Sequence, residues 1–415
     1  MAVVKPFKGI TPKRELAASV SCLPYDVMNR DEARKMALNK PHSFLHVVRS
    51  EIDFPDTVEP YAQCVYEKAR ENLDKMIGEG ILETAEKPVF YIYRQMMHGR
   101  VQTGLVARTS IDAYLKNQIK KHEFTRPKKE LDRINNFDYC DANTAPIFLT
   151  YKKNPVIHDI INNWIKFHRP DVQFTADDDI LHIVWTIDQD EVIKAISEAF
   201  EAVESLYIAD GHHRSASAAK VGLKRREMTP DYTGNEPFNY FMSVIFPDED
   251  LFIMDYNRIV KDLNSLDDDA FLKAISKYFE VSKADVSPFR PMNPHQFGMY
   301  LNREWYVLHA IEGMYNADDP VKRLDVSILQ DNLLGPILGI DDPRTDERID
   351  FVGGIRGLEE LEARVDSGRD RVAFSMYPTT MNDLTDIADA GEVMPPKSTW
   401  FEPKLRSGLF IHRLK

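Results

Sequence analysis

Five consecutive residues have side chains that could act together in catalysis: Asp210, Gly211, His212, His213 and Arg214. They follow an apolar run at 206–209 and precede an alanine-rich segment at 215–219. This order predicts a strand, a polar turn and the start of a helix. The first amides of a helix are unpaired and lie at the positive end of the helix dipole, so such a turn is suited to binding an anion.

The residue types in this turn favour phosphate as the anion. Gly211 allows a ligand to approach the backbone closely, and the planar guanidinium of Arg214 matches phosphate oxygens. Asp210 is the exception, because a carboxylate repels phosphate unless a metal ion or a proton lies between them. That combination favours phosphate chemistry over phosphate storage. An ordinary strand–turn–helix whose histidines only satisfy backbone groups is an equal alternative from these residues alone.

A second segment, residues 120–133, places Glu123 just before an expected helix. Thr125 is expected to cap that helix, and Lys128 lies one turn before Asp132. A loop carboxylate in the position of Glu123 can face a cleft. The alternative is a surface helix whose charges pair with one another at i,i+4 spacing.

Two known motifs fail on single residues. His122-Glu123 would need a second histidine one turn on to form a zinc-protease site, and the chain has Arg126 there. Residues 391–398 resemble a P-loop, but Pro396 stands where a backbone N–H must face phosphate. In this stretch, Lys397, Ser398 and Thr399 are expected to form a secondary anion-binding corner.

Two polar residues near the N-terminus stand within apolar surroundings. Arg49 could hold the carboxylate of an amino acid bidentately, and Asp26 could hold its ammonium group. Turn chemistry and surface polarity are the alternative for each.

Composition limits the classes of protein to which the chain can belong. At 415 residues it is long enough for two domains, and its net charge of −13 disfavours nucleic-acid binding. The basic cluster at 224–226 is short and fits the end of a helix. We find no apolar run of membrane-spanning length and no signal peptide at the N-terminus. Three scattered cysteines indicate a reducing cytoplasm.

Hydrophobic periodicity predicts a mixture of helices and strands, and therefore an α/β or α+β fold with a mixed sheet. We expect a main α/β domain over 1–260, a smaller α+β unit over 261–371, and a segment over 372–415 that returns to the main domain. Helices are expected at 30–38, 59–80, 111–119, 155–167, 190–203 and 267–281. Strands are expected at 89–95, 101–107, 146–151, 181–185, 205–209, 238–246, 251–254, 296–301 and 305–308.

The Asp210–Arg214 sequence resembles the phosphate loop of the ParB/sulfiredoxin-like superfamily, and in particular of its free-serine kinases. Nearly the whole chain resembles the DUF1015 family. The stretches that carry this resemblance are residues 4–9, 23–27, 43–47, 122–125 and 395–401.

The resemblance implies a ParB/sulfiredoxin-like core with additional N- and C-terminal elements, and a kinase acting on the hydroxyl of free L-serine. It implies pyrophosphate as the phosphate donor, with ADP or ATP next, and Mg²⁺ as cofactor. The net charge and the lack of a membrane-length apolar run predict no nucleic-acid or membrane partner. Glu123 is then the catalytic base, and Asp210 binds Mg²⁺ or orients the hydroxyl. The expected phosphate ligands are Gly211, His212, His213, Arg214 and Lys128, and the expected substrate ligands are Asp26, Arg49 and Thr125.

Two other functions use the same loop. One is a nucleotide- or phosphate-gated switch or scaffold of the ParB type, against which the net acidity counts. The other is a hydrolase of pyrophosphate or of a nucleotide, which differs from a kinase only in lacking an acceptor pocket. Thiol repair of the sulfiredoxin kind is disfavoured, because the position of its reactive cysteine is His212 here.

Overall fold

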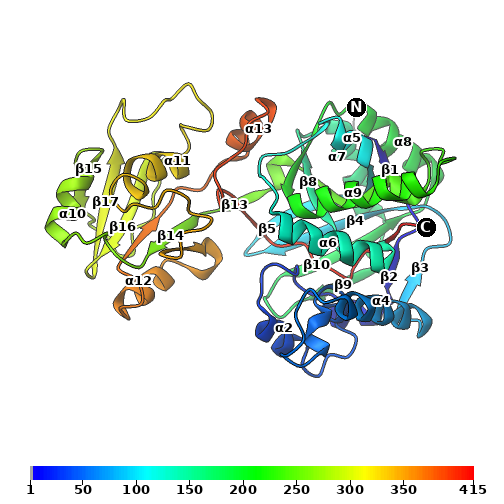
Figure 1. Ribbon diagram of the computed structural model, residues 1–415. Helices are drawn as coiled ribbons and strands as arrows, with labels where there is room; N and C mark the ends of the chain where they lie inside the picture. Colours follow the sequence, from blue (N-terminus) through cyan, green and yellow to red (C-terminus); the bar gives the residue numbers. More distant parts are fainter. Residues whose placement is uncertain (1–2) are drawn as a thin grey trace. The chain divides into compact units, whose positions relative to one another are not determined.

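The computed structural model describes residues 3–415, and the chain forms two compact units. Unit 1 contains the residues up to Leu251 and Pro403–Lys415, and unit 2 is Phe252–Glu402. Both combine helices and strands, which confirms the predicted mixed α/β class (Figure 1). The chain enters unit 2 at 252 and returns to unit 1 at 403, whereas the sequence placed these points at 261 and 372.

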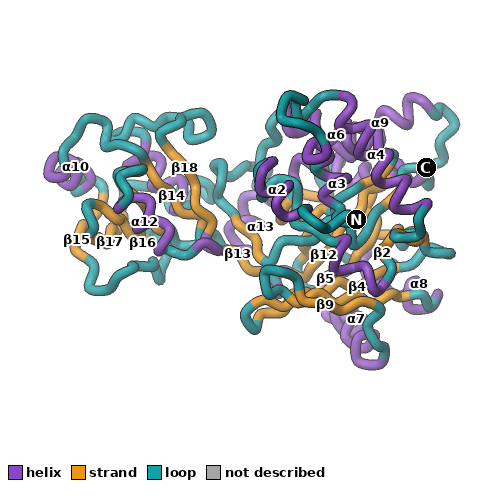
Figure 2. Tube along the Cα trace, turned by 90° about the horizontal axis from the view of Figure 1, so that it is seen from below, coloured by secondary structure: helices purple, strands orange, loops and turns teal. Residues whose placement is uncertain are grey.

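Unit 1 is built on a nine-stranded mixed sheet, whose strands are orange in Figure 2. The β6–β11 and β8–β12 pairs are parallel, and the other pairs are antiparallel. In spatial order the strands are β6 (Ile119–Lys120), β11 (Leu206–Asp210), β8 (Ile147–Tyr151), β12 (Tyr240–Pro247), β5 (Arg100–Ser110), β4 (Phe90–Met97), β10 (Leu181–Ile187) and β9 (Val172–Thr175), with β1 (Val4–Lys5) beside β5.

Successive side chains of these strands point to opposite faces of the sheet, and both faces are apolar. One face packs against helices α5, α7, α8 and α9, with residues such as Leu105, Ile208 and Trp164 fully or almost fully buried in a single core. The other face is crossed by the C-terminal segment, since Tyr91 and Tyr93 both contact the Phe410 ring. The main helices are α5 (Ile111–Leu115), α6 (Pro127–Cys140), α7 (Pro155–Phe167), α8 (Asp190–Glu201) and α9 (His212–Met228).

The N-terminal part of unit 1 forms its own core, to which helices α1, α2, α3 and α4 contribute buried residues. Asn29 caps α2 through a reciprocal pair of hydrogen bonds with Glu32, as its sequence position predicts. The elements here are β2 (Ile10–Pro12), α1 (Ala17–Val20), α2 (Arg30–Ala37), α3 (Leu45–Val48), α4 (Gln63–Gly78) and β3 (Leu82–Thr84), with short strands β7 (Ala142–Asn143) and β21 (His412–Arg413) pairing nearby.

The strands expected at 89–95 and 101–107 are present as β4 and β5, which pair as a hairpin with Met97 opposite Arg100 across the turn. Its two turn residues, His98 and Gly99, both have positive φ, at 48° and 79°. That geometry matches the twist of the two strands. The expected helix over 111–119 is shorter, because α5 ends at Leu115 and Ile119–Lys120 becomes the edge strand β6.

Unit 2 contains a six-stranded antiparallel sheet. The helix expected over 267–281 is wrong in its second half: α10 ends at Ile275, and 279–283 pairs with β17 as a strand. The elements are β13 (Phe252–Met254), β14 (Tyr256–Val260), α10 (Asp268–Ile275), β15 (Phe279–Lys283), β16 (Gln296–Leu301), β17 (Glu304–Ala310), α11 (Asp325–Leu329), β18 (Ile349–Gly353), α12 (Glu359–Asp366), β19 (Val372–Ser375), α13 (Met381–Asp389) and β20 (Trp400–Glu402).

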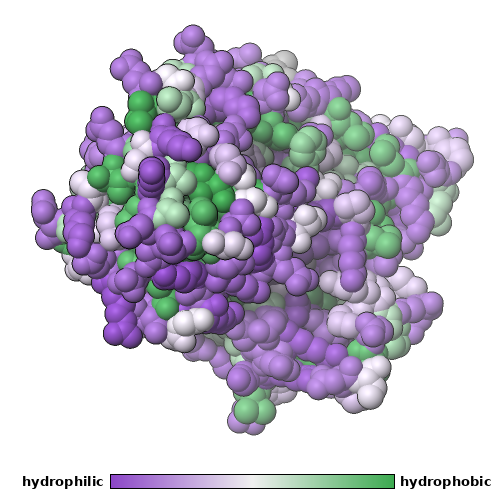
Figure 3. Space-filling model, turned by 60° about the vertical axis from the view of Figure 1, so that its left-hand side comes forward, coloured by the Kyte–Doolittle hydropathy of each residue, from purple (hydrophilic) through white to green (hydrophobic). Residues whose placement is uncertain are grey.

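None of the helices in residues 3–415 is both long enough and apolar enough to cross a membrane. The face drawn in Figure 3 is mostly hydrophilic, with hydrophobic side chains gathered only in small groups.

The tight packing of β5 against β12 gives a test of the sheet. A Cβ atom at Gly104 would lie 2.8 Å from side-chain atoms of both Phe246 and Val244. We expect Gly104→Ala to destabilise the protein by about 1–3 kcal/mol in urea unfolding, the usual cost of overpacking a core. The same change at Gly78 meets nothing within 4 Å, so Gly78→Ala should be neutral or stabilising by about 0.4–1 kcal/mol. Equal stability of the two variants would contradict this packing.

Candidate active site

The sheet brings the segment that contains Glu123 to the loop Asp210–Arg214, called the loop below. Strands β6 and β11 pair in parallel, with Tyr207 opposite Lys120. The chain leaving β6 therefore runs alongside the end of β11, where Asp210 and the start of α9 lie. Two regions that are far apart in sequence thus share one edge of the sheet.

Two hydrogen bonds then fix the segment to the loop. The backbone N–H of His122 donates to Nε2 of His212 at 3.4 Å, and the backbone N–H of Arg126 donates to Nε2 of His213 at 2.9 Å. The two donors lie on either side of Glu123 in the chain. We call this pair of bonds the histidine tether.

Glu123 faces the loop. Its Oε2 lies 3.8 Å from Nδ1 of His212, and its side chain is 41% exposed. Because Nε2 of His212 accepts a hydrogen bond, the proton of the neutral ring belongs on Nδ1, on the side of Glu123. The carboxylate is therefore oriented by the loop and still reachable from solvent.

The loop histidines are neutral at physiological pH. Burial lowers the pKa of His212 well below its ordinary value, and the neighbouring His122 lowers it further. Burial, and next the charge of Lys129, lowers the pKa of His213 to about 4. These rings are therefore acceptors in the histidine tether and do not offer positive charge to a phosphate.

His122 is itself a buried part of the site. It is 1% exposed, and burial lowers its pKa to about 4. Its ring packs edge-on against that of His212, with centroids 4.4 Å apart. Sequence reasoning used this residue only to test a zinc motif and missed its place beside the loop.

The start of α9 has the predicted geometry. Gly211 is the N-cap residue, with φ of 99°, a conformation that other residues rarely adopt. No side chain caps the helix, so the amides of its first turn are not satisfied in that way. A Cβ at position 211 would lie 3.0 Å from Nε of Arg214, so glycine also makes room for that side chain.

Asp210 is held by two cations. Its Oδ2 accepts from Nζ of Lys404 at 3.0 Å, and its Oδ1 lies 3.4 Å from Nη2 of Arg214. Burial acts to raise the pKa of Asp210, but Lys404 and Arg214 together bring it below its ordinary range. Asp210 is therefore ionised and its charge is compensated.

Arg214 points inward. Its side chain is 3% exposed, and besides Asp210 it donates from Nη1 to the carbonyl of Pro146. In this structure it positions Asp210 and the loop, and it is not free in solvent to meet a ligand.

Lys404 is a second residue of the site that sequence reasoning missed. It belongs to the segment that returns to unit 1, and Gln95 donates to its carbonyl at 2.9 Å. The prediction that the C-terminal segment returns to the main domain pointed to this part of the chain. No local sequence pattern identifies this lysine as a residue of the site.

Two expected residues of the Glu123 segment have other partners. Thr125 is not the N-cap of α6, which is Arg126; its hydroxyl donates to Oε2 of Glu130 at 2.7 Å. Lys128 lies over the Tyr61 ring, 5.1 Å from its centroid. Asp132, the expected partner of Lys128, instead forms an ion pair with its neighbour Arg133.

Asp26 and Arg49 do come together, on the wall of one cavity of about 330 Å³. Arg49 is already engaged, because its Nε lies 2.7 Å from Oε1 of Glu51 and its Nη1 donates to the carbonyl of Tyr25 at 3.0 Å. Asp26 acts electrostatically on His213, which places this cavity near the loop.

The expected anion corner at 397–399 belongs to unit 2. Its Ser398 hydroxyl donates to the carbonyl of Pro395 at 2.6 Å, and Lys397 lies over the ring of Tyr256 at 5.3 Å.

The basic cluster at the end of α9 is paired with acids of unit 1. Lys224 and Arg225 both bind Asp138, and Arg226 binds Asp112 at 2.8 Å. The cluster is therefore not a free basic patch.

A Mg²⁺ ion is usually held by one or two carboxylates together with substrate phosphates. Asp210 is the carboxylate in the loop, but Lys404 and Arg214 already engage its oxygens. Residues 3–415 contain no group of three or more His, Cys, Asp or Glu side chains arranged to hold a metal. The side chains therefore do not form a ready-made cage for the ion.

Comparison with known proteins gives a family and several distant structural likenesses. A free serine kinase in complex with AMP is 14% identical, with a TM-score of 0.37, over 72% of this chain and 86% of its own. A conserved hypothetical protein from Pyrococcus furiosus is 15% identical, with a TM-score of 0.34, over 72% of this chain and 90% of its own. C-terminally truncated SbnI from Staphylococcus aureus is 10% identical, with a TM-score of 0.37, over 73% of this chain and 85% of its own.

No curated protein matches the chain. The model of DUF1015, a family of proteins of unknown function, matches residues 4–327. Since this match covers well over half of the sequence, the chain belongs to the DUF1015 family.

Proposed function

We propose that the protein is a small-molecule kinase that transfers a phosphoryl group to the hydroxyl of free L-serine. The observation that carries the proposal is the position of Glu123, whose carboxylate lies 3.8 Å from His212 at the uncapped start of α9. A carboxylate beside an anion-binding helix start joins a base to a phosphate site.

The donor phosphates lie at the amides of the first turn of α9, where the helix dipole favours negative charge. Glu123 accepts the proton of the serine hydroxyl as its oxygen attacks the terminal phosphorus. The bond between that phosphorus and the bridging oxygen of the donor breaks, and the remaining phosphate leaves with the bond's electron pair. The products are O-phosphoserine and the shortened donor.

Lys404 and Arg214 prevent Asp210 from repelling the donor, because they compensate its negative charge. The ammonium of Lys404 also lies at the loop, where it can approach a phosphate oxygen. Asp210 would hold Mg²⁺ together with the donor phosphates, and the ion would neutralise part of the donor's negative charge.

Pyrophosphate is the proposed donor, with ADP or ATP second, because the chain has no recognisable adenine-binding motif. The test incubates the full chain with L-serine, Mg²⁺ and each donor in turn, and follows O-phosphoserine by ³¹P NMR and mass spectrometry. Release of phosphate without O-phosphoserine would make the protein a hydrolase instead. Nucleotide binding without any turnover would favour the switch.

We expect Glu123→Gln to lower kcat by about 10²–10⁴, because it removes the base and keeps the shape of the side chain. The dissociation constant of the donor, measured by calorimetry, should change little. Glu191→Gln, at an exposed carboxylate on α8, is the matched control and should retain full activity. If Glu123→Gln kept most of its kcat, the segment would be structural and Asp210 would become the leading base.

We expect Lys404→Met to lower both activity and stability, because it leaves Asp210 with one cationic partner. Loss of a charge-assisted hydrogen bond costs about 1–3 kcal/mol of unfolding free energy at pH 7. The lowered pKa of Asp210 stabilises the folded state above the pKa of an unfolded aspartate, about 4, and that contribution is lost as pH falls. The stability difference between wild type and Lys404→Met should therefore be largest at neutral pH.

Urea unfolding at several pH values between 3 and 7 measures this difference. Lys404→Arg keeps the charge and should recover most of the stability. A constant difference across the whole pH range would mean that Lys404 does not act through Asp210.

A further inference from the structure

The cavity of about 330 Å³ that Asp26 and Arg49 line is also lined by the segment that contains Glu123. Lys129, Asp132 and Arg133, all on α6, form one wall. The other wall comes from the N-terminal part of unit 1, before α4. We call this space the Arg133 cavity.

Arg133 is the buried cation of this cavity, with a side chain that is 5% exposed. Its Nε and Nη2 both donate to Oδ2 of Asp132, at 2.9 and 2.6 Å. Its guanidinium lies over the ring of Tyr25, 3.9 Å from the centroid. Its third nitrogen, Nη1, is buried and has no hydrogen-bond partner within residues 3–415. A buried donor without a partner is costly, and a carboxylate is the group that best satisfies a guanidinium.

Both signs of charge line the Arg133 cavity. The lining includes four cations and three acids: Arg30, Arg49, Lys129, Arg133, Asp26, Glu51 and Asp132. Two of the acids are paired with arginines of the same cavity, Glu51 with Arg49 and Asp132 with Arg133. The third acid, Asp26, is exposed. A zwitterion gains from such a wall, because its carboxylate meets a cation and its ammonium meets a carboxylate.

Both walls of the cavity lie beside the loop. Asp26 and Lys129 are close enough to His213 for their charges to act on its pKa, which Lys129 lowers and Asp26 raises. The charge of Arg214 acts in the same way on Tyr25. His213 is also the acceptor of one bond of the histidine tether, so the cavity and the tether share a neighbour.

Helix α6 connects the cavity to the tether. Arg126, Lys129 and Arg133 follow one another at spacings of three and four residues and therefore share one side of the helix. About 10 Å of helix rise separates Arg126 from Arg133. Because side chains on a helix tilt toward its N-terminal end, the Arg133 side chain spans part of that distance. A ligand held by this guanidinium therefore extends toward the tether and Glu123.

We propose that the Arg133 cavity binds the α-carboxylate and α-ammonium groups of a free amino acid, the acceptor of the phosphoryl group. The carboxylate accepts from Nη1 of Arg133, the ammonium binds Asp26, and the hydroxyl points toward Glu123. The inference rests on the proposed function. It gives the carboxylate to Arg133 in place of Arg49, which the sequence predicted but which is already engaged.

This cavity makes the protein selective for a free amino acid. A serine within a protein chain has neutral amides in place of both charged groups, so it would leave the Arg133 nitrogen and the Asp26 carboxylate without their partners. The volume of about 330 Å³ is near the lower end for small-molecule pockets, which suits a small metabolite. Since Nη1 is buried, a side chain of the wall must turn for a ligand to reach it, and Tyr61 is 47% exposed.

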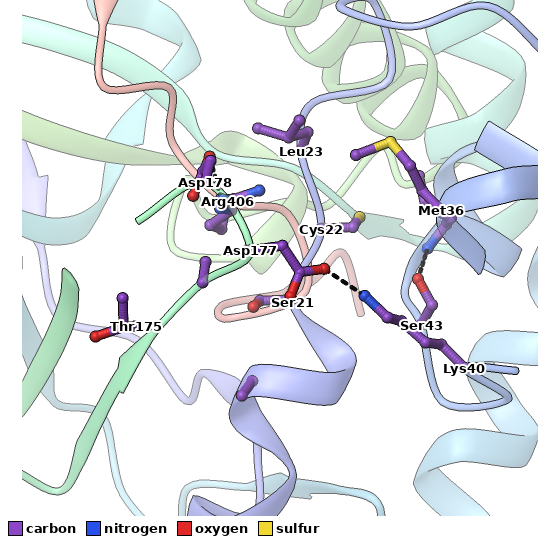
Figure 4. A pocket seen from close by; sticks show the side chains of 13 residues that line it. Ser21, Cys22, Leu23, Met36, Lys40, Ser43, Thr175, Asp177, Asp178 and Arg406 are labelled. Carbon is purple, nitrogen blue, oxygen red and sulfur yellow. Dashed lines mark hydrogen bonds and ion pairs between the residues drawn. The ribbon is translucent and has the colours of Figure 1, made fainter. Parts of the chain in front are cut away.

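Another cavity of unit 1, of about 240 Å³, provides a control site (Figure 4). Lys40 and Asp177 form an ion pair there, at 2.6 Å. Among the described residues that line it, none belongs to 120–133 or to the loop. The Asp177 side chain is 90% exposed, so it can be changed without disturbing the core.

The experiment measures L-serine binding to the full chain by calorimetry, without donor. We expect Asp26→Asn and Arg133→Lys each to weaken binding at least tenfold. Arg133→Lys keeps a cation beside Asp132 and removes Nη1, whereas Asp26→Asn changes an exposed side chain and covers the case in which the Arg133 substitution disturbs folding. Asp177→Asn is the matched control and should bind L-serine normally.

Two analogues of L-serine test which charge each residue recognises. Serinamide lacks the carboxylate and 3-hydroxypropionate lacks the ammonium group, and both should bind wild type at least tenfold more weakly than L-serine. Asp26→Asn should bind L-serine and 3-hydroxypropionate with similar affinity. Arg133→Lys should discriminate less than wild type between L-serine and serinamide. A purely structural role for either residue would leave these ratios as they are in wild type.

The outcomes separate this inference from the proposed function. Unchanged affinity in Asp26→Asn and Arg133→Lys, or no L-serine binding by wild type, would overturn the cavity, whatever the transfer assay gives. Formation of O-phosphoserine with an unchanged KM for L-serine in both variants would support the kinase and overturn the cavity. Binding that depends on both residues without formation of O-phosphoserine would support the cavity and overturn the kinase.

Discussion

The candidate site depends on one constraint, the histidine tether. Nε2 atoms of His212 and His213 accept hydrogen bonds from backbone amides on either side of Glu123, so the loop fixes the position of the carboxylate. An imidazole can accept only while it is neutral. Burial lowers the pKa of both rings, and this keeps the tether intact at physiological pH. The parallel pairing of β6 with β11 brings the two regions close enough for it to form.

The second requirement of the site is that the negative charge of Asp210 is compensated, and the return of the chain to unit 1 supplies one of the two cations that do so. A carboxylate at a phosphate loop is unfavourable unless cations offset it. Arg214 comes from the loop itself, whereas Lys404 arrives after the whole of unit 2. The return also packs Phe410 on the sheet. Unit 2 is thus an insertion between two parts of unit 1 that must meet.

Sequence reasoning reached the features that are local. The strand–glycine–helix order at Gly211 and the two strands on either side of His98-Gly99 follow from short-range periodicity and turn chemistry, and the structure has them. Sequence reasoning failed where a contact with a remote part of the chain determines the local structure. Residues 279–283 form a strand because β17 pairs with them, and Thr125 bonds Glu130 instead of capping α6. Lys404 could not be found locally, since its partner is remote in sequence.

The roles within the loop also differ from those that residue types suggest. Histidines and an arginine after a glycine resemble a set of phosphate ligands, yet the structure uses both imidazoles and most of the guanidinium internally. Gly211 belongs to the same arrangement, because a Cβ there would meet Arg214 at 3.0 Å. The loop is therefore a rigid scaffold for Glu123 and Asp210. In the proposed function, the first amides of α9 and the ammonium of Lys404 are the groups beside this scaffold that can meet a donor phosphate.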